Sequence, residues 1–242
     1  MGGDLTAALF SGPELRGGGP GPFVQRCEPD IVVGHGLGDL AALAAAQVLD
    51  VEDAVELSRL REQLIARANA EQAGGMLCVV AAKADAAARH IAALSGARVA
   101  RQDSPRRVVL AGSHEQLTHA RDAAEELYVS VVDVRAPGAV HGPAMAFAAR
   151  RFSNALAAVP FGDATRIVYS TVTAAPMRDP RAELTACLLT PVLWRQTILA
   201  LNAAGVARYV EAGRDRPLGD LVLETLAAGA RADARSDLLN AH

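Results

Sequence analysis

The sequence predicts an α/β fold in which a domain built on a parallel sheet is interrupted by a smaller domain. A short apolar run at residues 30–35 leads through a glycine-rich turn into an apolar helix, which is the pattern of a buried parallel strand followed by its helix. Residues 74–136 instead follow the order βαββαβ, which is typical of a ferredoxin-like unit. Helices and strands of the first kind return from residue 143 onward.

Composition bounds the class of protein before any motif is considered. The chain has 242 residues, of which 51% are hydrophobic and 21% charged, so it can bury a real core. A net charge of −3 gives no reason to expect nucleic acid as a partner, and no apolar run is long enough to span a bilayer. The N-terminus shows no secretory signal, and three distant cysteines (Cys27, Cys78, Cys187) indicate free thiols in a reducing cytoplasm.

The first part of the chain predicts a loop, one strand and two helices. Residues 12–22 are rich in glycine and proline and predict a loop or linker. The strand at 30–35 is followed by a helix at 39–47 and by a longer helix at about 50–72, which the Asp50 carboxylate can cap. In the longer helix Arg61 shares an apolar stripe with Ala54, Leu57, Leu60 and Leu64, an unusual place for a guanidinium without a partner.

The remaining elements divide into a small unit and a continuation of the large one. The small unit has strands at 76–82, 97–101, 108–111 and 129–134 and helices at 84–94 and 113–127. Helices then follow at 143–159, 183–189, 194–204 and 217–228, and strands at 167–170 and 207–210. We therefore expect a glycine/proline-rich segment at 1–22, a large domain made of 23–73 and 137–242, and a small domain at 74–136.

The turn Gly34-His-Gly-Leu-Gly38 has the arrangement of a nucleophile elbow, in which a central side chain projects from a sharp bend between a strand and a helix. This feature makes the large domain α/β-hydrolase-like. The central position holds Gly36, which has no side chain and cannot attack a thioester. A plain glycine-rich turn explains the same five residues equally well.

Several segments in order resemble malonyl-CoA:acyl carrier protein transacylases and polyketide acyltransferase domains. The segment Val32-Val-Gly-His-Gly-Leu-Gly-Asp-Leu-Ala-Ala-Leu43 resembles the family's Gly-His-Ser-Leu-Gly-Glu block, with glycine in place of serine. The further matches are Val48–Ala54, Arg59–Leu64, Gly75-Met76, Gly138–Met145, Thr190–Trp194 and Val210–Gly213. The resemblance covers about residues 23–227. It implies malonyl-CoA or a related acyl-CoA and acyl carrier protein as partners, fatty acid or polyketide biosynthesis as the setting, and no cofactor or metal.

The resemblance also implies roles for individual residues in catalysis. Gly36 takes the nucleophile position, and His141 matches the general base that deprotonates the serine and then protonates the leaving thiol. Arg61 matches the arginine that pairs with the malonyl carboxylate, although a structural salt bridge or a snorkelling side chain explains it as well. The backbone N–H of Leu37 is implied as an oxyanion donor.

Other matched residues are implied to shape the acyl pocket. His35 matches the histidine beside the serine, in the pocket wall. Gly138, Ala139 and Val140 resemble the short motif that correlates with malonyl preference, where phenylalanine is usual at the position of Val140. Cys187 stands where the family has a glutamine that orients the histidine.

The chain departs from the family pattern at four places. Serine is replaced by Gly36, and the N-terminal block that carries an oxyanion glutamine is not recognisable, with Leu9–Pro13 as a faint remnant. Its absence predicts a missing strand and an unpaired sheet edge. Cys187 replaces the glutamine. Asp103–Pro105 and Thr171 replace asparagines, and Arg214 replaces a proline. Together these changes indicate a relaxed or lost active site.

Four functional hypotheses stay open from the sequence. The chain is an acyltransferase impaired in transfer, a non-catalytic partner that binds acyl-CoA or carrier protein for a synthase, a residual thioester hydrolase in which His141 activates water, or the product of an engineered or decaying gene. The spacing of His114 and His119 is one residue too long for a zinc motif and predicts a solvated helix face.

Overall fold

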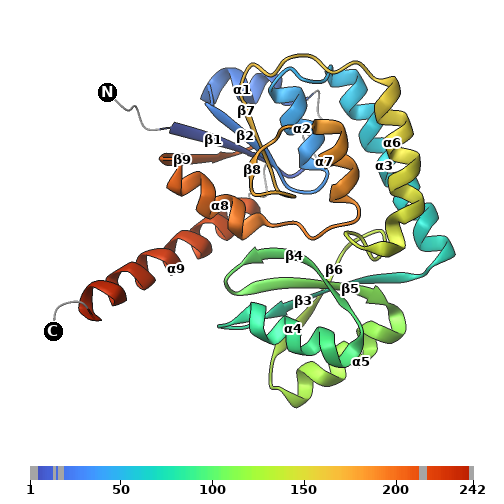
Figure 1. Ribbon diagram of the computed structural model, residues 1–242, viewed down its shortest axis with the longest axis vertical. Coiled ribbons are helices and arrows are strands. Elements are labelled where there is room, and N and C mark those ends of the chain that lie inside the picture. The colour runs from blue at the N-terminus through green and yellow to red at the C-terminus, as the bar shows by residue number, and fades with distance from the viewer. Residues whose placement is uncertain (1–4, 13–14, 16–18, 213–216, 240–242) are drawn as a thin grey trace.

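The computed structural model describes residues 5–12, 15, 19–212 and 217–239, and it contains two sheets (Figure 1). The larger sheet has the strand order β8–β7–β2–β1–β9. Its strands are β1 (Leu5–Phe10), β2 (Ile31–Gly34), β7 (Ile167–Ser170), β8 (Ala175–Pro176) and β9 (Val206–Glu211). All neighbouring pairs are parallel except β7 and β8, so the parallel sheet predicted for the large domain is confirmed.

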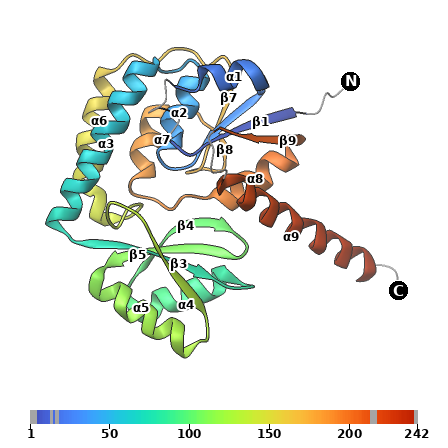
Figure 2. The ribbon, with the colours of Figure 1, turned by 180° about the vertical axis from the view of Figure 1, so that it is seen from behind.

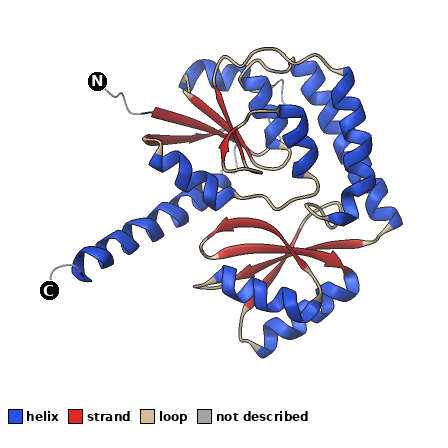
Figure 3. Cartoon of the chain, viewed as in Figure 1, coloured by secondary structure: helices blue, strands red, loops and turns tan. Residues whose placement is uncertain are grey.

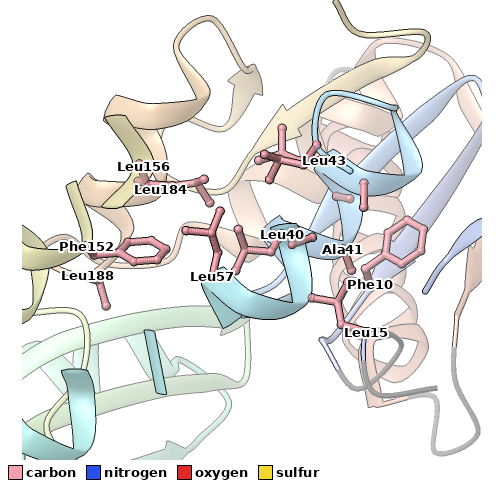
Figure 4. Close-up of a cluster of buried hydrophobic side chains, with 14 of the residues drawn as sticks. Phe10, Leu15, Leu40, Ala41, Leu43, Leu57, Phe152, Leu156, Leu184 and Leu188 are labelled. Carbon is pink, nitrogen blue, oxygen red and sulfur yellow. The ribbon is translucent and has the colours of Figure 1, made fainter. Parts of the chain in front are cut away.

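Helices cover both faces of this sheet because successive strand residues point to opposite sides (Figure 3). Ala8, Phe10 and Val32 face a core shared with α2 (Gly38–Ala45), α3 (Val51–Glu71), α6 (Ala146–Ala158) and α7 (Pro180–Cys187). Figure 4 shows part of this core, with Leu40 and Leu57 between Phe10 and Phe152. Ala7 and Leu9 face α8 (Trp194–Ala203) and α9 (Pro217–Leu239).

The smaller sheet has the strand order β4–β5–β3–β6 and is antiparallel throughout. Its strands are β3 (Gly74–Val80), β4 (Arg98–Ser104), β5 (Arg107–Ser113) and β6 (Ser130–Val134), and α4 (Ala84–Ser95) and α5 (His114–Glu126) cover the face turned away from the large sheet (Figure 2). This is the split βαβ arrangement of a ferredoxin-like domain. The predicted fold class is confirmed.

The expectation of a missing N-terminal strand was wrong. Strand β1 lies between β2 and β9, pairing Phe10 with Gly34 and Leu9 with Glu211, so it is an interior strand of the large sheet. A helix, α1 (Gly21–Cys27), also begins inside the segment expected to be loop. Residues 13–14 and 16–18 of that segment lie outside the described residues.

Smaller differences concern the ends and faces of the helices. Asp50 stands at the N-cap of α3 but its carboxylate makes no capping hydrogen bond. The helix expected from residue 143 begins as a 3₁₀ turn, Pro143–Met145, and α9 continues to Leu239. The buried stripe of α3 is Ala54, Leu57, Arg61, Ile65 and Ala68, while Leu60 and Leu64 are half-buried.

The two sheets are joined along β4, which lies against α8 and α9. Val192, just before α8, accepts a hydrogen bond from Gln102 N at 2.9 Å and donates one to Ala100 O at 2.9 Å. Glu224 of α9 accepts from the Ser104 hydroxyl at 2.6 Å and pairs with Arg107 at 3.0 Å. These contacts hold β4 of the small sheet against α8 and α9 of the large domain.

Candidate functional site

The turn between β2 and α2 has the close backbone contacts of a nucleophile elbow. A Cβ at Gly34 would lie 2.1 Å from Asp39 N, and a Cβ at Gly38 would lie 1.9 Å from Phe10 O, so both positions require glycine. Gly36 has φ of +65°, the strained conformation of the central elbow residue, but a Cβ there would meet nothing within 4 Å. The backbone of the elbow is present, and the space for a central side chain is open.

The N-terminal end of α2 provides a place for negative charge beside Gly36. Leu37 is the N-cap of α2, and within the described residues no carbonyl accepts a hydrogen bond from its N–H. A Cβ at Gly12 would lie 2.8 Å from Leu37 Cβ, and Phe10 O accepts from His35 N at 2.9 Å. The segment after β1 therefore lies against the elbow, where an N–H group at a helix start favours an anion.

His141 is oriented for general-base chemistry. The side chain is 7% exposed, and its Nδ1 donates to the carbonyl of Cys187 at 2.5 Å. Because that carbonyl can only accept, the proton is on Nδ1 and Nε2 is left as the basic nitrogen. Burial, followed by the charge of Arg61, lowers the pKa of His141 to about 3, so the ring is neutral near pH 7. A backbone carbonyl orients the histidine, so the replacement of glutamine by cysteine does not remove that contact.

Arg61 is a nearly unpaired cation in the core. It is 4% exposed, and its Nη2 donates to Cys187 Sγ at 3.6 Å. In the described part of the chain no carboxylate oxygen lies within 4.0 Å of its nitrogens. A buried guanidinium in this state is suited to a bidentate carboxylate from a ligand.

Two residues beside Arg61 complete a buried polar cluster. Cys187 contacts Arg61 through its thiol and His141 through its carbonyl, so it links the two. Asp39, in the first turn of α2, is 4% exposed, and Arg61 acts on it electrostatically. Sequence analysis gave no role to Asp39. The signal available was its place in the matched block, where Asp39 stands at the position of the family's glutamate.

His35 joins the elbow to the small domain. Its ring packs edge-on against Trp194, with centroids 5.2 Å apart, and its Nε2 lies 3.2 Å from Asp103 Oδ1. Asp103 also accepts from Arg101 at 3.0 Å. Burial raises the pKa of Asp103, but Arg101 and His35 outweigh it and the net shift is downward. Asp103, which the sequence marked only as a departure, thus fixes His35 from β4.

The loop before His141 packs in the domain interface. Gly138 lies against α3, since a Cβ there would come within 2.8 Å of Asn69. Ala139 and Val140 are buried with the main core. Ala139 and His141 also line a cavity of about 220 Å³ whose other walls include Gln72, Arg98, Ser113, Gln116 and Pro143. The acyl-preference role of this motif stays a prediction.

Within the described residues the structure contains neither a metal-binding cluster nor a membrane-spanning helix. No group of three or more His, Cys, Asp or Glu side chains is placed to hold a metal ion. Among the described helices, none is both long and apolar enough to cross a membrane.

Comparison with known proteins agrees with this geometry. The family model described as acyl transferase domain matches residues 21–214. The polyketide biosynthesis protein ThaF of Burkholderia thailandensis is 33% identical over 205 residues, covering 82% of this chain and 17% of ThaF. A malonyl CoA-acyl carrier protein transacylase of Synechocystis is 30% identical over 208 residues, covering 82% of this chain and 67% of that protein.

Solved structures agree as well. A malonyl-transacylase solved in complex with a type II polyketide synthase acyl-carrier protein is 26% identical with a TM-score of 0.78, and the match covers 85% of this chain and 70% of the solved one. The chain therefore spans between a sixth and about two thirds of the length of these relatives. With a family match that covers most of its length, the chain belongs to the acyl transferase domain family.

Proposed function

We propose that this chain binds malonyl-type thioesters of coenzyme A and of acyl carrier protein and does not form an acyl-enzyme. The observation that carries the proposal is the elbow: its backbone is present, and its central residue is Gly36, with no nucleophilic atom. Transfer in this family passes the acyl group to a side-chain oxygen at that position. Loss of such a nucleophile lowers the rate on the order of a million-fold.

Arg61 supports a ligand that carries a carboxylate. Its guanidinium is buried and lacks a carboxylate partner among the described residues. A terminal carboxylate on the acyl group would supply two charge-assisted hydrogen bonds and neutralise the cation. The malonyl group has such a carboxylate, and malonyl-CoA is the substrate in the names of the transacylase relatives.

Acyl carrier protein is the proposed macromolecular partner. The support is the solved relative in complex with an acyl-carrier protein, together with a cavity beside His141 between the two domains. In the proposed function, the chain binds a malonyl group carried by acyl carrier protein and forms no covalent bond to it.

A second function is favoured by the open space at Gly36. A water molecule in the place of a serine hydroxyl could lose its proton to His141 Nε2 while its oxygen attacks the thioester carbonyl. The C–S bond then breaks and the sulfur takes the proton from His141, which leaves a free carboxylic acid and a thiol. That reaction would make the chain a slow thioester hydrolase.

The test pairs the unmodified chain with its Gly36→Ser variant. Both are incubated with malonyl-CoA, and intact mass is measured. We expect no adduct on the unmodified chain and a malonyl adduct on the variant, because a serine side chain fits the open space. An adduct on the unmodified chain would overturn the proposal. A variant without adduct would place the loss of transfer beyond Gly36.

Hydrolysis and carrier binding are measured with the same proteins. Release of free coenzyme A that disappears in His141→Ala would favour the hydrolase, whereas tight binding of malonyl-CoA and carrier protein without release would favour the non-catalytic role. Arg61→Ala should weaken binding of malonyl-CoA at least tenfold because it removes the cation that meets the carboxylate. Unchanged binding would contradict the carboxylate contact.

A further inference from the structure

Asp39 carries a buried carboxylate that the proposed reaction does not use. It lies in the first turn of α2, where every residue from Gly38 to Ala45 is buried. Its Oδ1 has no hydrogen-bond partner within the described residues. A buried, ionised oxygen without a partner is costly, so such a group tends to hold a proton or to wait for a ligand.

The carboxylate of Asp39 and the guanidinium of Arg61 are near but not in contact. Arg61 acts on Asp39 electrostatically, yet the two are not within 4.0 Å as an ion pair. The thiol of Cys187 interacts with both, since it accepts from Arg61 at 3.6 Å and hydrogen-bonds with Asp39. Burial and the charge of Asp39 raise the pKa of Cys187 to about 12, so the thiol is neutral. The positive charge of Arg61 is thus only partly neutralised by the neighbouring side chains.

The charged and titratable groups that act on Asp39 come from two helices. Arg61 belongs to α3, and Cys187 and Glu183 belong to α7. Burial raises the pKa of Asp39 and the charge of Arg61 and the hydrogen bond of Cys187 oppose the rise, while Glu183 adds a small increase; the net pKa is about 7. The charge of Arg61 also acts on His141, but His141 is neutral above its pKa of about 3 and adds no charge to the cluster.

We propose that Asp39 couples the binding of an acyl carboxylate at Arg61 to the uptake of one proton. This inference rests on the proposed function, in which a malonyl carboxylate meets Arg61. With the ligand bound, the buried cluster holds one cation and two carboxylates, and two like charges at close range in a dry site do not both stay ionised. The ligand carboxylate is held by Arg61, so Asp39 takes the proton.

The coupling makes pH a determinant of acyl specificity. Below about pH 7 Asp39 is already protonated and malonyl-CoA binds without proton uptake. Above that pH the free site has lost the proton and must regain it, so the affinity for malonyl-CoA falls by up to about tenfold per pH unit. Acetyl-CoA brings no carboxylate to Arg61, so its affinity should not fall in this way. Asp39 is in this sense a specificity-determining residue.

Titration calorimetry of the unmodified chain tests the proton count directly. Malonyl-CoA and acetyl-CoA are titrated at about pH 6 and about pH 8.5, each in two buffers of different ionisation enthalpy. We expect close to one proton taken up per malonyl-CoA at the higher pH and close to none at the lower pH. Acetyl-CoA corrects for titration of the coenzyme phosphates and should show no additional uptake. Equal proton counts for the two ligands at the higher pH would overturn the inference.

Two matched variants locate the proton. Asp39→Asn keeps the shape of the side chain and removes its titration, so the affinity for malonyl-CoA should no longer fall between about pH 7 and about pH 9. Glu183→Gln removes a neighbouring carboxylate on α7 and should leave the fall in place. A fall that persists in Asp39→Asn would assign the proton elsewhere and overturn the inference. If Asp39→Asn does not fold, the calorimetric count on the unmodified chain decides.

Arg61→Ala separates failure of this inference from failure of the proposed function. Binding of malonyl-CoA that needs Arg61 but takes up no proton would contradict only the role of Asp39. Binding that is indifferent to Arg61 would contradict the carboxylate contact and, with it, the proposed function.

Discussion

At the scale of single residues, the three glycines of the elbow have different structural demands. Gly34 and Gly38 have no room for a side chain because backbone atoms occupy that space. Gly36 has the room but adopts φ of +65°, which an L-residue adopts only with strain. The strand-to-helix turn is therefore held by its flanking glycines, and its centre is sterically free to change.

This difference predicts unequal effects of two alanine substitutions. Gly36→Ala should lower the free energy of unfolding by about 1–2 kcal/mol, the strain of a left-handed L-residue. Gly38→Ala should cost about 3 kcal/mol or more, because its Cβ would lie 1.9 Å from Phe10 O and β1 and α2 would have to separate. Urea unfolding of both variants measures the difference. Equal losses would show that the turn does not have this geometry.

The candidate site residues that the sequence indicates stand in recognisable local patterns, and their roles stay predictions. The elbow, Arg61 and His141 each stand in a recognisable segment, and the structure links Arg61 and His141 through Cys187. The role of Asp39 and the His35–Asp103 contact were not assigned from the sequence, because the partners of these side chains are distant in the sequence and meet only in the folded chain. A contact between segments this far apart leaves no pattern in the local sequence.

At the scale of elements, Glu224 of α9 anchors β4 of the small sheet. It accepts from Ser104, whose side chain is fully buried, and pairs with Arg107. Glu224→Ala should lower the free energy of unfolding by about 1–3 kcal/mol because the Ser104 hydroxyl loses its acceptor. It should also speed amide exchange in β4.

The exposed pair of Arg67 and Glu71 on α3 provides the control for this prediction. Both side chains are more than half exposed and 3.7 Å apart, so Glu71→Ala should change stability by less than about 1 kcal/mol. Chemical denaturation and hydrogen exchange measure both variants. Exchange in β4 that is equally fast in the two variants would contradict the anchoring role of Glu224.

Most elements were predictable. The two-residue strand β8 was not, and neither were the longer elements β1 and α1. Residues 7–10 of β1 are buried on both faces, so the strand lacks the alternation of polar and apolar residues that marks a half-buried strand. Helix α1 begins at a glycine–proline pair that is equally typical of a loop. Both elements are stabilised by the sheet and core around them, and that tertiary contribution is not visible in the local sequence.

At the scale of the whole molecule, two buried groups give stability opposite dependences on pH. The pKa of Asp39 is raised from 3.8 to about 7, so the folded chain binds the extra proton and this stability is lost as pH rises toward 7. The pKa of His141 is lowered from 6.5 to about 3, so the unfolded chain binds the extra proton and stability is lost as pH falls below 6.5. Between about pH 4 and 6.5 the two slopes cancel.

Variants should separate the two slopes. Between about pH 5 and 6.5, Asp39→Asn should become more stable with rising pH, relative to the unmodified chain, by about 1 kcal/mol per pH unit. His141→Gln should show the opposite slope of similar size. Urea unfolding at several pH values measures both. Parallel curves for the two variants would contradict the assigned pKa shifts.

The place of β1 between β2 and β9 has a consequence for biosynthesis. Synthesis runs from the N- to the C-terminus, so within this chain β1 and β2 emerge before the other strands, but β1 gains its second neighbour only after residue 211 is made. The four strands of the small sheet are complete by residue 134. The inserted domain can therefore fold while the large sheet is still open, and the nascent chain carries β1 with one unpaired edge until residue 211 is made.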